Sequence, residues 1–397
     1  MSDGGGKRVS WVELYFDLIF VFAVSQVAHA IVEEPRWGRA FGALGLFATL
    51  WWTWIGYAVL YNRQGDDRQP LHRLLVLAGT VPCGIAATQA HHVFEGHPAG
   101  FALALAGARL VLAVAFTIAG RAVVEARRVA RGYLLSAVLF AVSAALPERW
   151  CYALWAFALL QEGGFLLLGE RRGRQRGPRR SRADRIKALF KPPANAGIAV
   201  DAGHLAERFG LFMIILLGEL VITVGGAALD RGEQDLSYWL SVLGGLVLAG
   251  ALWWVYFDSA ADVNERLLHM SGGNPALAYS LYAGGHLPPA FALLLIAAGV
   301  NLSLHEEPPG VAVWFVTVGL VVYFGGTRTF SPRSRKGWIW LPWLVLAAAT
   351  ACVALLGLVL SAPAVVAVAA GWAVAAAALV TLLRRGTVRR LEEFLGP

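Results

Sequence analysis

The segment WVELYFDLIFVFAVSQV, residues 11–27, indicates the fold class more directly than any other part of the chain. It belongs to an apolar run that continues to about residue 32, and about 20 mostly apolar residues suffice to cross a hydrocarbon core about 30 Å thick. The run follows Lys7 and Arg8 and lacks the small-residue cleavage site of a secretory signal peptide. We therefore expect a retained first membrane span, and comparable runs recur almost to residue 383.

The composition supports the same conclusion for the whole chain. Of its 397 residues, 57% are hydrophobic and only 15% are charged, whereas soluble domains average about 25% charged residues. The predicted fold is an all-α integral membrane protein with about twelve transmembrane helices. Hydropathy and loop residues place them at 11–32, 40–61, 71–90, 99–120, 132–146, 149–168, 205–226, 238–258, 275–299, 311–327, 339–360 and 363–383.

The distribution of basic residues predicts the orientation. Most of the 34 Lys and Arg residues fall in loops or tails on one side of the expected spans, the side that also holds both termini. Positively charged loops resist translocation, so both termini are expected in the cytoplasm of a multi-pass plasma membrane protein. Because these charges lie in loops between apolar runs and not on one folded face, the net charge of +8 does not indicate a nucleic-acid partner.

One basic loop divides the chain. Residues 170–191 contain ten Lys and Arg residues, which suggests a first six-helix half at 1–169, a cytoplasmic linker at 170–196 and a second half at 197–397. Arg179, Arg180 and Arg182 are candidate contacts for anionic lipid head groups. The alternative is a solvated linker that only sets orientation.

The two halves resemble each other in sequence. Residues 48–58, ATLWWTWIGYA, align with residues 250–260, GALWWVYFDSA; residues 11–27 align with 205–221, and Pro82 aligns with Pro288. Six spans separate the copies, so we expect two parallel six-helix repeats related by an axis along the membrane normal. Chance alignment of interfacial tryptophans is the alternative.

Ionisable residues inside the spans are the candidate functional residues, because each charge at membrane depth costs about 2.5 kcal/mol or more and needs a partner. Glu13 and Asp17 are four residues apart and share one helical face. Two carboxylates this close repel each other, which suits proton exchange. For Glu13, near the start of its span, interfacial snorkelling is the alternative.

The segment HLAERFGLFMIILLGEL, residues 204–220, contains the densest group. His204, Arg208 and Glu219 lie on one side of the helix, with Glu207 on the flank. We expect Arg208 to compensate a carboxylate of the first span. Glu219 is the strongest single candidate, and it must be protonated, bind a cation or pair across helices with a group such as Arg109.

Further candidates lie in other spans. Arg109 interrupts an apolar helix, although a fixed Arg can simply join helices. Asp258 ends the eighth span, and His286 precedes Pro288 and Pro289, where we expect the helix to break and to free polar groups for a midplane site. A packing histidine is the alternative for His286. Gln161 and Glu162 are weaker candidates for the same lining.

Other chemistries lack a signature. No Walker A, GxSxG or HExxH sequence is present, and Cys83, Cys151 and Cys352 form no CxxC pair. His91, His92 and His97 surround Glu95 at a spacing only weakly like that of metal ligands. We therefore expect neither a cofactor nor a resident metal ion.

Five motifs, ELYFDLIFVFAVSQ, LWWTWIGY, HLAERFGLFMIILLGEL, WWVYFD and GHLPP, occur in this order. With them the sequence resembles the bacterial low temperature requirement A family over nearly its whole length. The resemblance implies a multi-span membrane protein linked to growth in the cold, without a defined chemistry. It places the family's recurrent polar positions on Glu13, Asp17, His204, Glu207, Arg208, Glu219, Asp258 and His286. One departure is Leu211, which stands in the second copy where the first has Asp17.

The functional hypothesis is an ion- or proton-coupled transporter of a small molecule or ion, because twelve spans, a parallel repeat and intramembrane ionisable groups are typical of secondary transporters. One alternative is a membrane-embedded enzyme acting on a lipid or hydrophobic small molecule, with Glu219 and His286 as general acid and base. The other is a non-catalytic membrane scaffold or sensor that recruits partners through the basic loop.

Overall fold

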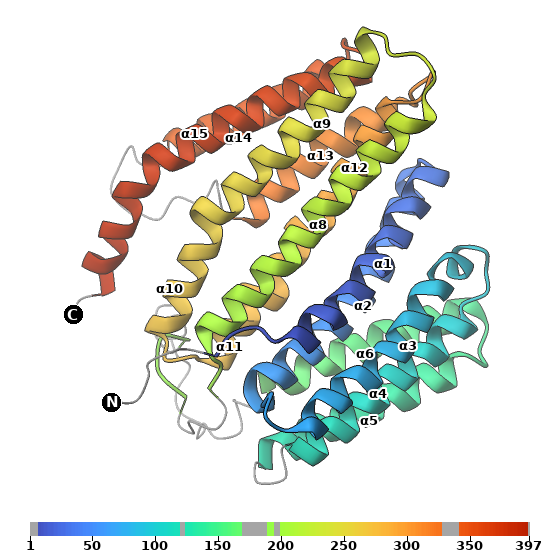
Figure 1. Cartoon of the computed structure of the whole chain (residues 1–397), viewed down its shortest axis with the longest axis vertical. Helices are drawn as coiled ribbons and strands as arrows, with labels where there is room; N and C mark the ends of the chain where they lie inside the picture. The colour runs from blue at the N-terminus through green and yellow to red at the C-terminus, as the bar shows by residue number, and fades with distance from the viewer. Residues whose placement is uncertain (1–6, 120–123, 169–188, 194–198, 328–340, 396–397) are drawn as a thin grey trace. The chain divides into compact units, whose positions relative to one another are not determined.

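The computed structural model describes residues 7–119, 124–168, 189–193, 199–327 and 341–395. These residues are almost entirely helical and contain no β-strand. The first six helices (Figure 1) are α1 (Trp11–Glu33), α2 (Trp37–Gln64), α3 (Pro70–Phe94), α4 (Ala99–Ala119), α5 (Val124–Ser143) and α6 (Glu148–Leu168). The later elements are α8 (Ala202–Asp230), α9 (Leu236–Val255), η3 (Tyr256–Ala261), α10 (Asp262–Met270), α11 (Pro275–Ala278), η4 (Tyr279–Gly284), α12 (Gly285–Ser303), α13 (Val311–Gly326), α14 (Leu341–Leu356) and α15 (Ala362–Leu395).

Eight continuous helices in the described residues are long and apolar enough to cross a membrane. They are α1 to α4, α8, the run Leu236–Met270, the run Pro275–Ser303 and the first part of α15 to Leu382. Helix α13 is apolar but has only 16 residues, and α5 and α6 each contain three or more charged residues. Each of the predicted spans therefore coincides with a helix. The count of twelve membrane crossings stays a prediction.

The surfaces of these helices are apolar to a degree that water-soluble domains avoid. Large aliphatic side chains such as Leu18, Leu103, Leu160 and Ile222 are about half to three-quarters exposed. At the same time, charged side chains are fully buried within the helices. This distribution is that of a chain whose surrounding solvent is lipid.

The chain divides into two compact units. Unit 1 contains Met1–Val27, Gly45–Phe209 and Glu265–Ala283. Within it α3, α4, α5 and α6 pack in chain order, each against the next (Figure 1). The ring of Tyr57 on α2 packs directly on Gly79 of α3, where an added Cβ would collide with it. A glycine at this position makes room for the large side chain of the neighbouring helix.

Unit 2 contains Ala28–Leu44, Gly210–Asn264 and Gly284–Pro397. Its centre is α12, which is buried over nearly its whole length and packs on α13, with further contacts to α9 and α15. Gly299 of α12 faces Val316 of α13, and Gly319 of α13 faces Ile296 of α12, so the two helices exchange close contacts. The predicted boundary between halves at 170–196 stays a prediction, because these two units are composed differently and most of the linker lies outside the described residues.

Two expectations about individual spans are corrected. The predicted fifth span, 132–146, corresponds to a helix that begins earlier, at Val124, and includes three arginines in its first two turns. The expected break near Pro288 and Pro289 is absent, since both prolines lie inside α12. The chain instead forms the π-helical turn η4 directly before α12. Proline removes a helical donor, and a local change to wider π turns lets the helix continue.

Candidate functional site

The start of α1 fixes the position of Glu13. Ser10 precedes the helix, and its hydroxyl accepts a hydrogen bond from the Glu13 backbone N–H at 3.4 Å. In return, the Glu13 carboxylate accepts from the Ser10 backbone N–H at 3.1 Å. This reciprocal pair is a capping box, which the spacing Ser-x-x-Glu encodes. Glu13 is therefore held at the helix entry with its second oxygen directed to other partners.

The start of α8 is fixed in a similar way. The Asp201 carboxylate accepts from the His204 backbone N–H at 3.0 Å and so caps the helix. Asn62, near the end of α2, binds both backbone groups of Asp201: its Nδ2 donates to the Asp201 carbonyl at 2.9 Å, and its Oδ1 accepts from the Asp201 N–H at 3.1 Å. These two bonds determine which way the Asn62 amide faces.

Four ionisable side chains meet between α1 and the first turns of α8 within unit 1, and we call them the α1–α8 cluster: Glu13, Asp17, His204 and Arg208. Arg208 donates to Glu13 Oε1 through Nη1, and its Nη2 donates to Asp17 Oδ1 at 3.0 Å. His204 Nε2 lies 3.1 Å from Glu13 Oε2. All four residues are 0% exposed. Arg208 thus contacts both carboxylates of the first span.

Aromatic residues close the cluster on the α2 side. The indole Nε1 of Trp54 donates to Asp17 Oδ1 at 2.6 Å, and the Arg208 guanidinium lies 5.6 Å from the Trp54 ring centre. Trp51 and Phe209 pack against Trp54 at centroid distances of 5.5 Å and 4.9 Å. The charges are therefore enclosed by rings that exclude water and strengthen electrostatic interactions.

The protonation of His204 follows from its neighbours. Its Nδ1 lies 3.0 Å from Nδ2 of Asn62, and that amide nitrogen is a donor because Asp201 fixes the orientation of the amide. Nδ1 must then accept, which leaves the ring proton on Nε2, facing Glu13. A doubly protonated ring would place two donors against each other. Asn62 therefore favours neutral His204.

With His204 neutral, the cluster contains two carboxylates and one guanidinium, so one negative charge is in excess. A net charge enclosed among apolar helices is costly, and binding one proton removes it. Both oxygens of Glu13 accept hydrogen bonds from charged or backbone donors. Asp17 Oδ2, by contrast, is buried without a hydrogen-bond partner in the described residues. Asp17 is therefore the carboxylate with an oxygen available for the proton.

The chain before α1 covers the edge of the cluster. Lys7 Nζ donates to the carbonyl oxygens of Tyr61 and, at 2.8 Å, of Gly65, at the end of α2. Burial lowers the pKa of Lys7, and the nearby Glu13, Asp67 and Asp201 carboxylates partly oppose this effect. Glu207 lies outside the cluster, exposed, where it accepts from the Val9 N–H at 3.1 Å.

Arg109 belongs to a second buried group in unit 1. Its Nε donates to Glu162 Oε1 at 2.8 Å and its Nη1 to the Thr53 hydroxyl at 2.9 Å, and the guanidinium lies 4.2 Å from the Phe140 ring centre. The suggested pairing of Arg109 with Glu219 is therefore replaced by a pairing with Glu162. One Arg and one carboxylate balance in charge, and together they join α2, α4, α5 and α6.

The remaining candidates lie in unit 2. Glu219 is 5% exposed and accepts from the Thr223 hydroxyl at 3.1 Å. His286 Nε2 lies 2.9 Å from the Tyr256 hydroxyl, and Asp258 accepts from the Thr381 hydroxyl at 2.8 Å. Tyr256 and Asp258 belong to the π-helical turn η3, and π turns are often found at functional sites. The nine candidates thus form one cluster of four, the separate Arg109 pair, the flanking Glu207 and three residues in unit 2.

Comparison with known proteins assigns the chain to a protein family. The model of the bacterial low temperature requirement A protein (LtrA) family matches residues 8–381, nearly the whole chain. The chain belongs to this family. The chain is 25% identical over 304 residues to the uncharacterized protein RA0937 of Rhizobium meliloti (strain 1021), covering 75% of this chain and 70% of that protein. No solved structure matches it. With its apolar helices, this member of the LtrA family is a multi-pass membrane protein.

Several residues of the site in this LtrA-family protein were not predicted from the sequence. Trp54, Asn62, Asp201 and Ser10 all contact the cluster or position it. The patterns Ser10-x-x-Glu13 and Asp201-x-x-His204 are helix-start signals that mark two of them. Trp54 and Asn62 contact residues far away in sequence, and no local pattern identifies such partners. The predicted lipid contacts Arg179, Arg180 and Arg182 lie outside the described residues.

Proposed function

We propose that this LtrA-family protein is a proton-coupled secondary transporter of a small solute in the plasma membrane, and that Asp17 holds the exchangeable proton. The observation that carries the proposal is the α1–α8 cluster: two fully buried carboxylates share one guanidinium, next to a histidine held neutral. A cluster with one excess negative charge at membrane depth has to take up a cation, and a proton is the smallest.

A purely structural role would be expected to satisfy all buried polar atoms. In the described residues Asp17 Oδ2 and Arg208 Nε of the cluster have no hydrogen-bond partner, and neither do Arg109 Nη2 and Glu162 Oε2 of the second group. Water or a bound solute can fill such positions. In the proposal, Asp17 Oδ2 is the oxygen that takes up the exchangeable proton.

A change in the protonation of Asp17 would alter its electrostatic interactions with several neighbouring residues. Asp17 faces Arg208 of α8 and Trp54 of α2, while Glu13 lies one turn earlier on its own helix. His204 and Lys7 lie beyond Glu13. When Asp17 is neutral, Arg208 forms an ion pair with Glu13 alone, so the electrostatic attraction between α1 and α8 weakens. Helix positions that depend on protonation are what a proton-coupled carrier requires.

The wider arrangement completes the proposal. The chain would cross the membrane twelve times as two parallel six-helix repeats with both termini in the cytoplasm, as the basic loops predict. Glu219, Asp258 and His286 in unit 2, and Glu207 and Arg109 in unit 1, are the further candidates for proton or solute contact. Labelling single cysteines from each side of right-side-out vesicles tests this topology, since a tag in 170–191 must react only from the inside.

Transport is tested with purified protein in liposomes that contain a pH-sensitive dye. A membrane potential is imposed while amino acids, sugars and organic cations are added one at a time outside. The proposal predicts that at least one solute changes the lumenal pH with the native protein and with Glu306→Gln, an exposed carboxylate control. Asp17→Asn should abolish the change. Absence of any pH response to every solute, or a full response in Asp17→Asn, contradicts the proposal.

A further inference from the structure

An open groove of about 620 Å³ lies between α4 and α5 in unit 1, away from the α1–α8 cluster. Apolar side chains form most of its wall, and Leu110, Val114 and Leu134 are each 43% to 49% exposed there. In a chain that spans a bilayer, an apolar surface of this kind is covered by lipid acyl chains. An acyl chain that lies in this groove therefore has more van der Waals contact than one that lies on the convex surface of the surrounding helices.

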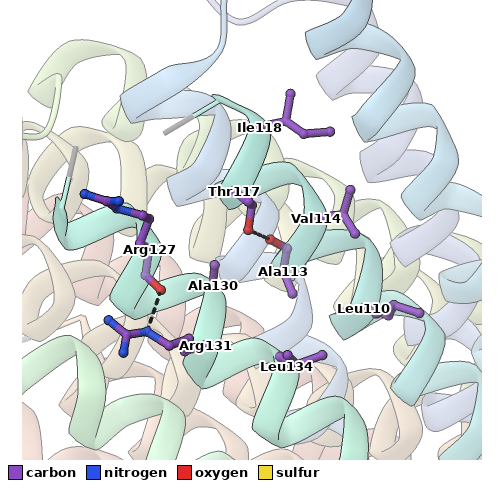
Figure 2. Close-up of a pocket in the computed structure, with 9 residues that line it drawn as sticks. All are labelled: Leu110, Ala113, Val114, Thr117, Ile118, Arg127, Ala130, Arg131 and Leu134. Atoms are coloured by element: carbon purple, nitrogen blue, oxygen red, sulfur yellow. Dashed lines mark hydrogen bonds between the residues drawn. The ribbon is translucent and has the colours of Figure 1, made fainter. Parts of the chain in front are cut away.

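Two arginines line the same groove (Figure 2). Arg127 and Arg131 lie one helical turn apart on α5, both exposed, and Arg131 Nε donates to the Arg127 carbonyl at 3.3 Å. Like charges four residues apart on a helix repel each other. Neither arginine forms an ion pair with a described side chain. Among the described side chains, the pair therefore has no counter-charge beside the apolar hollow.

The depth of the arginines fits a head group. Arg127 lies in the first turn of α5, shortly after the end of α4 at Ala119, and Arg131 lies about 6 Å further along α5. Leu110 lies eight residues before Ile118 on α4, about 12 Å deeper at 1.5 Å per residue. The loop between α4 and α5 is predicted to be cytoplasmic from its basic residues. Two guanidinium groups whose long side chains can reach toward the membrane face, with an apolar trough beside and below them, match the two ends of a phospholipid.

We propose that this groove binds one anionic phospholipid of the inner leaflet, with its phosphate between Arg127 and Arg131 and an acyl chain along Leu110, Val114 and Leu134. Guanidinium groups bind phosphate oxygens in a planar, two-bonded geometry that suits this position. This site is distinct from the basic loop at 170–191. It does not depend on the transport proposal, because it involves neither the cluster nor its neighbours.

The binding is tested by native mass spectrometry of the full chain, released from detergent in the presence of phosphatidylglycerol or of phosphatidylcholine with the same acyl chains. Phosphatidylglycerol should bind the more tightly. Each basic residue near an anionic lipid contributes roughly a fivefold gain, so Arg127→Gln and Arg131→Gln should each weaken binding about fivefold and the double variant about 30-fold. Arg128→Gln, half-buried and outside the groove lining, is the charge-matched control and should change binding less than twofold.

A second variant tests the apolar half of the site without altering charge. Val114→Phe places a larger side chain in the groove and should reduce phosphatidylglycerol binding about as much as a single arginine change. Inorganic phosphate at millimolar concentration should not compete. Equal binding of the two lipids, an effect of Arg128→Gln as large as that of Arg131→Gln, unchanged binding in Val114→Phe, or displacement by phosphate would each overturn the proposal.

Discussion

Nδ1 of His204 lies 3.0 Å from Nδ2 of Asn62, and the backbone of Asp201 sets the orientation of that amide. Asn62 thereby keeps the ring proton of His204 on Nε2, toward Glu13. In Asn62→Asp, an acceptor would face Nδ1 and allow both ring nitrogens to carry a proton. Solution NMR with ¹⁵N-labelled histidine should show the neutral Nε2–H tautomer in the native protein and the doubly protonated ring in Asn62→Asp at neutral pH. The Nδ1–H tautomer in the native protein would contradict this reading.

The Arg109–Glu162 pair should behave as a balanced buried ion pair. Removing one partner leaves an unpaired charge, so Arg109→Met or Glu162→Leu should each lower the free energy of unfolding by about 3 kcal/mol. The double variant should recover most of that loss, because no buried charge remains. Denaturant unfolding in mixed micelles measures all three. Additive losses in the double variant would show that the two side chains do not act as a pair.

The packing of the Tyr57 ring against α3 depends on Gly79. A Cβ there would collide with the Tyr57 ring, and Tyr57 cannot easily withdraw because its hydroxyl donates to the Ala108 carbonyl at 2.9 Å. Gly79→Ala should therefore cost about 2 kcal/mol of unfolding free energy. Gly218→Ala, with no heavy atom within 4 Å of the new Cβ, should be neutral or slightly stabilising. An equal loss of unfolding free energy in both variants would show that the effect comes from the helix backbone and not from a collision with Tyr57.

Lys7 should give the stability a dependence on alkaline pH. Its pKa in the folded chain is lowered by burial from the ordinary 10.5, so between these two values the unfolded chain binds more protons than the folded one. The unfolding free energy contributed by Lys7 therefore rises with pH across that window. Thermal midpoints of native protein minus those of Lys7→Gln should increase as pH approaches 10.5 and stay level at lower pH. A difference that falls with rising pH would contradict the assignment.

The sequence carried much of the information about the helices and the cluster. Each apolar run corresponds to a helix, and the four-residue spacings of Glu13 with Asp17 and of His204 with Arg208 place each pair on one face. Because buried charges need partners, the contact of Arg208 with the first span could be predicted before the structure. These inferences rest on local periodicity and on the cost of charge in lipid.

Other features could not be predicted in this way. Periodicity shows which face of a helix is polar but not which helix it meets, so the partner of Arg109 and the role of Asn62 required tertiary contacts. The expected break at Pro288 was wrong because a π-helical turn before α12 accommodates the missing donor.

An infrared pH titration of the purified protein, following the carbonyl stretch of protonated carboxylic acids, measures directly whether Asp17 carries the exchangeable proton. We expect a band from one buried acid that disappears as pH rises, is missing in Asp17→Asn and persists in Glu306→Gln. A native spectrum without such a band, or a band unchanged in Asp17→Asn, would contradict the assignment of the exchangeable proton to Asp17.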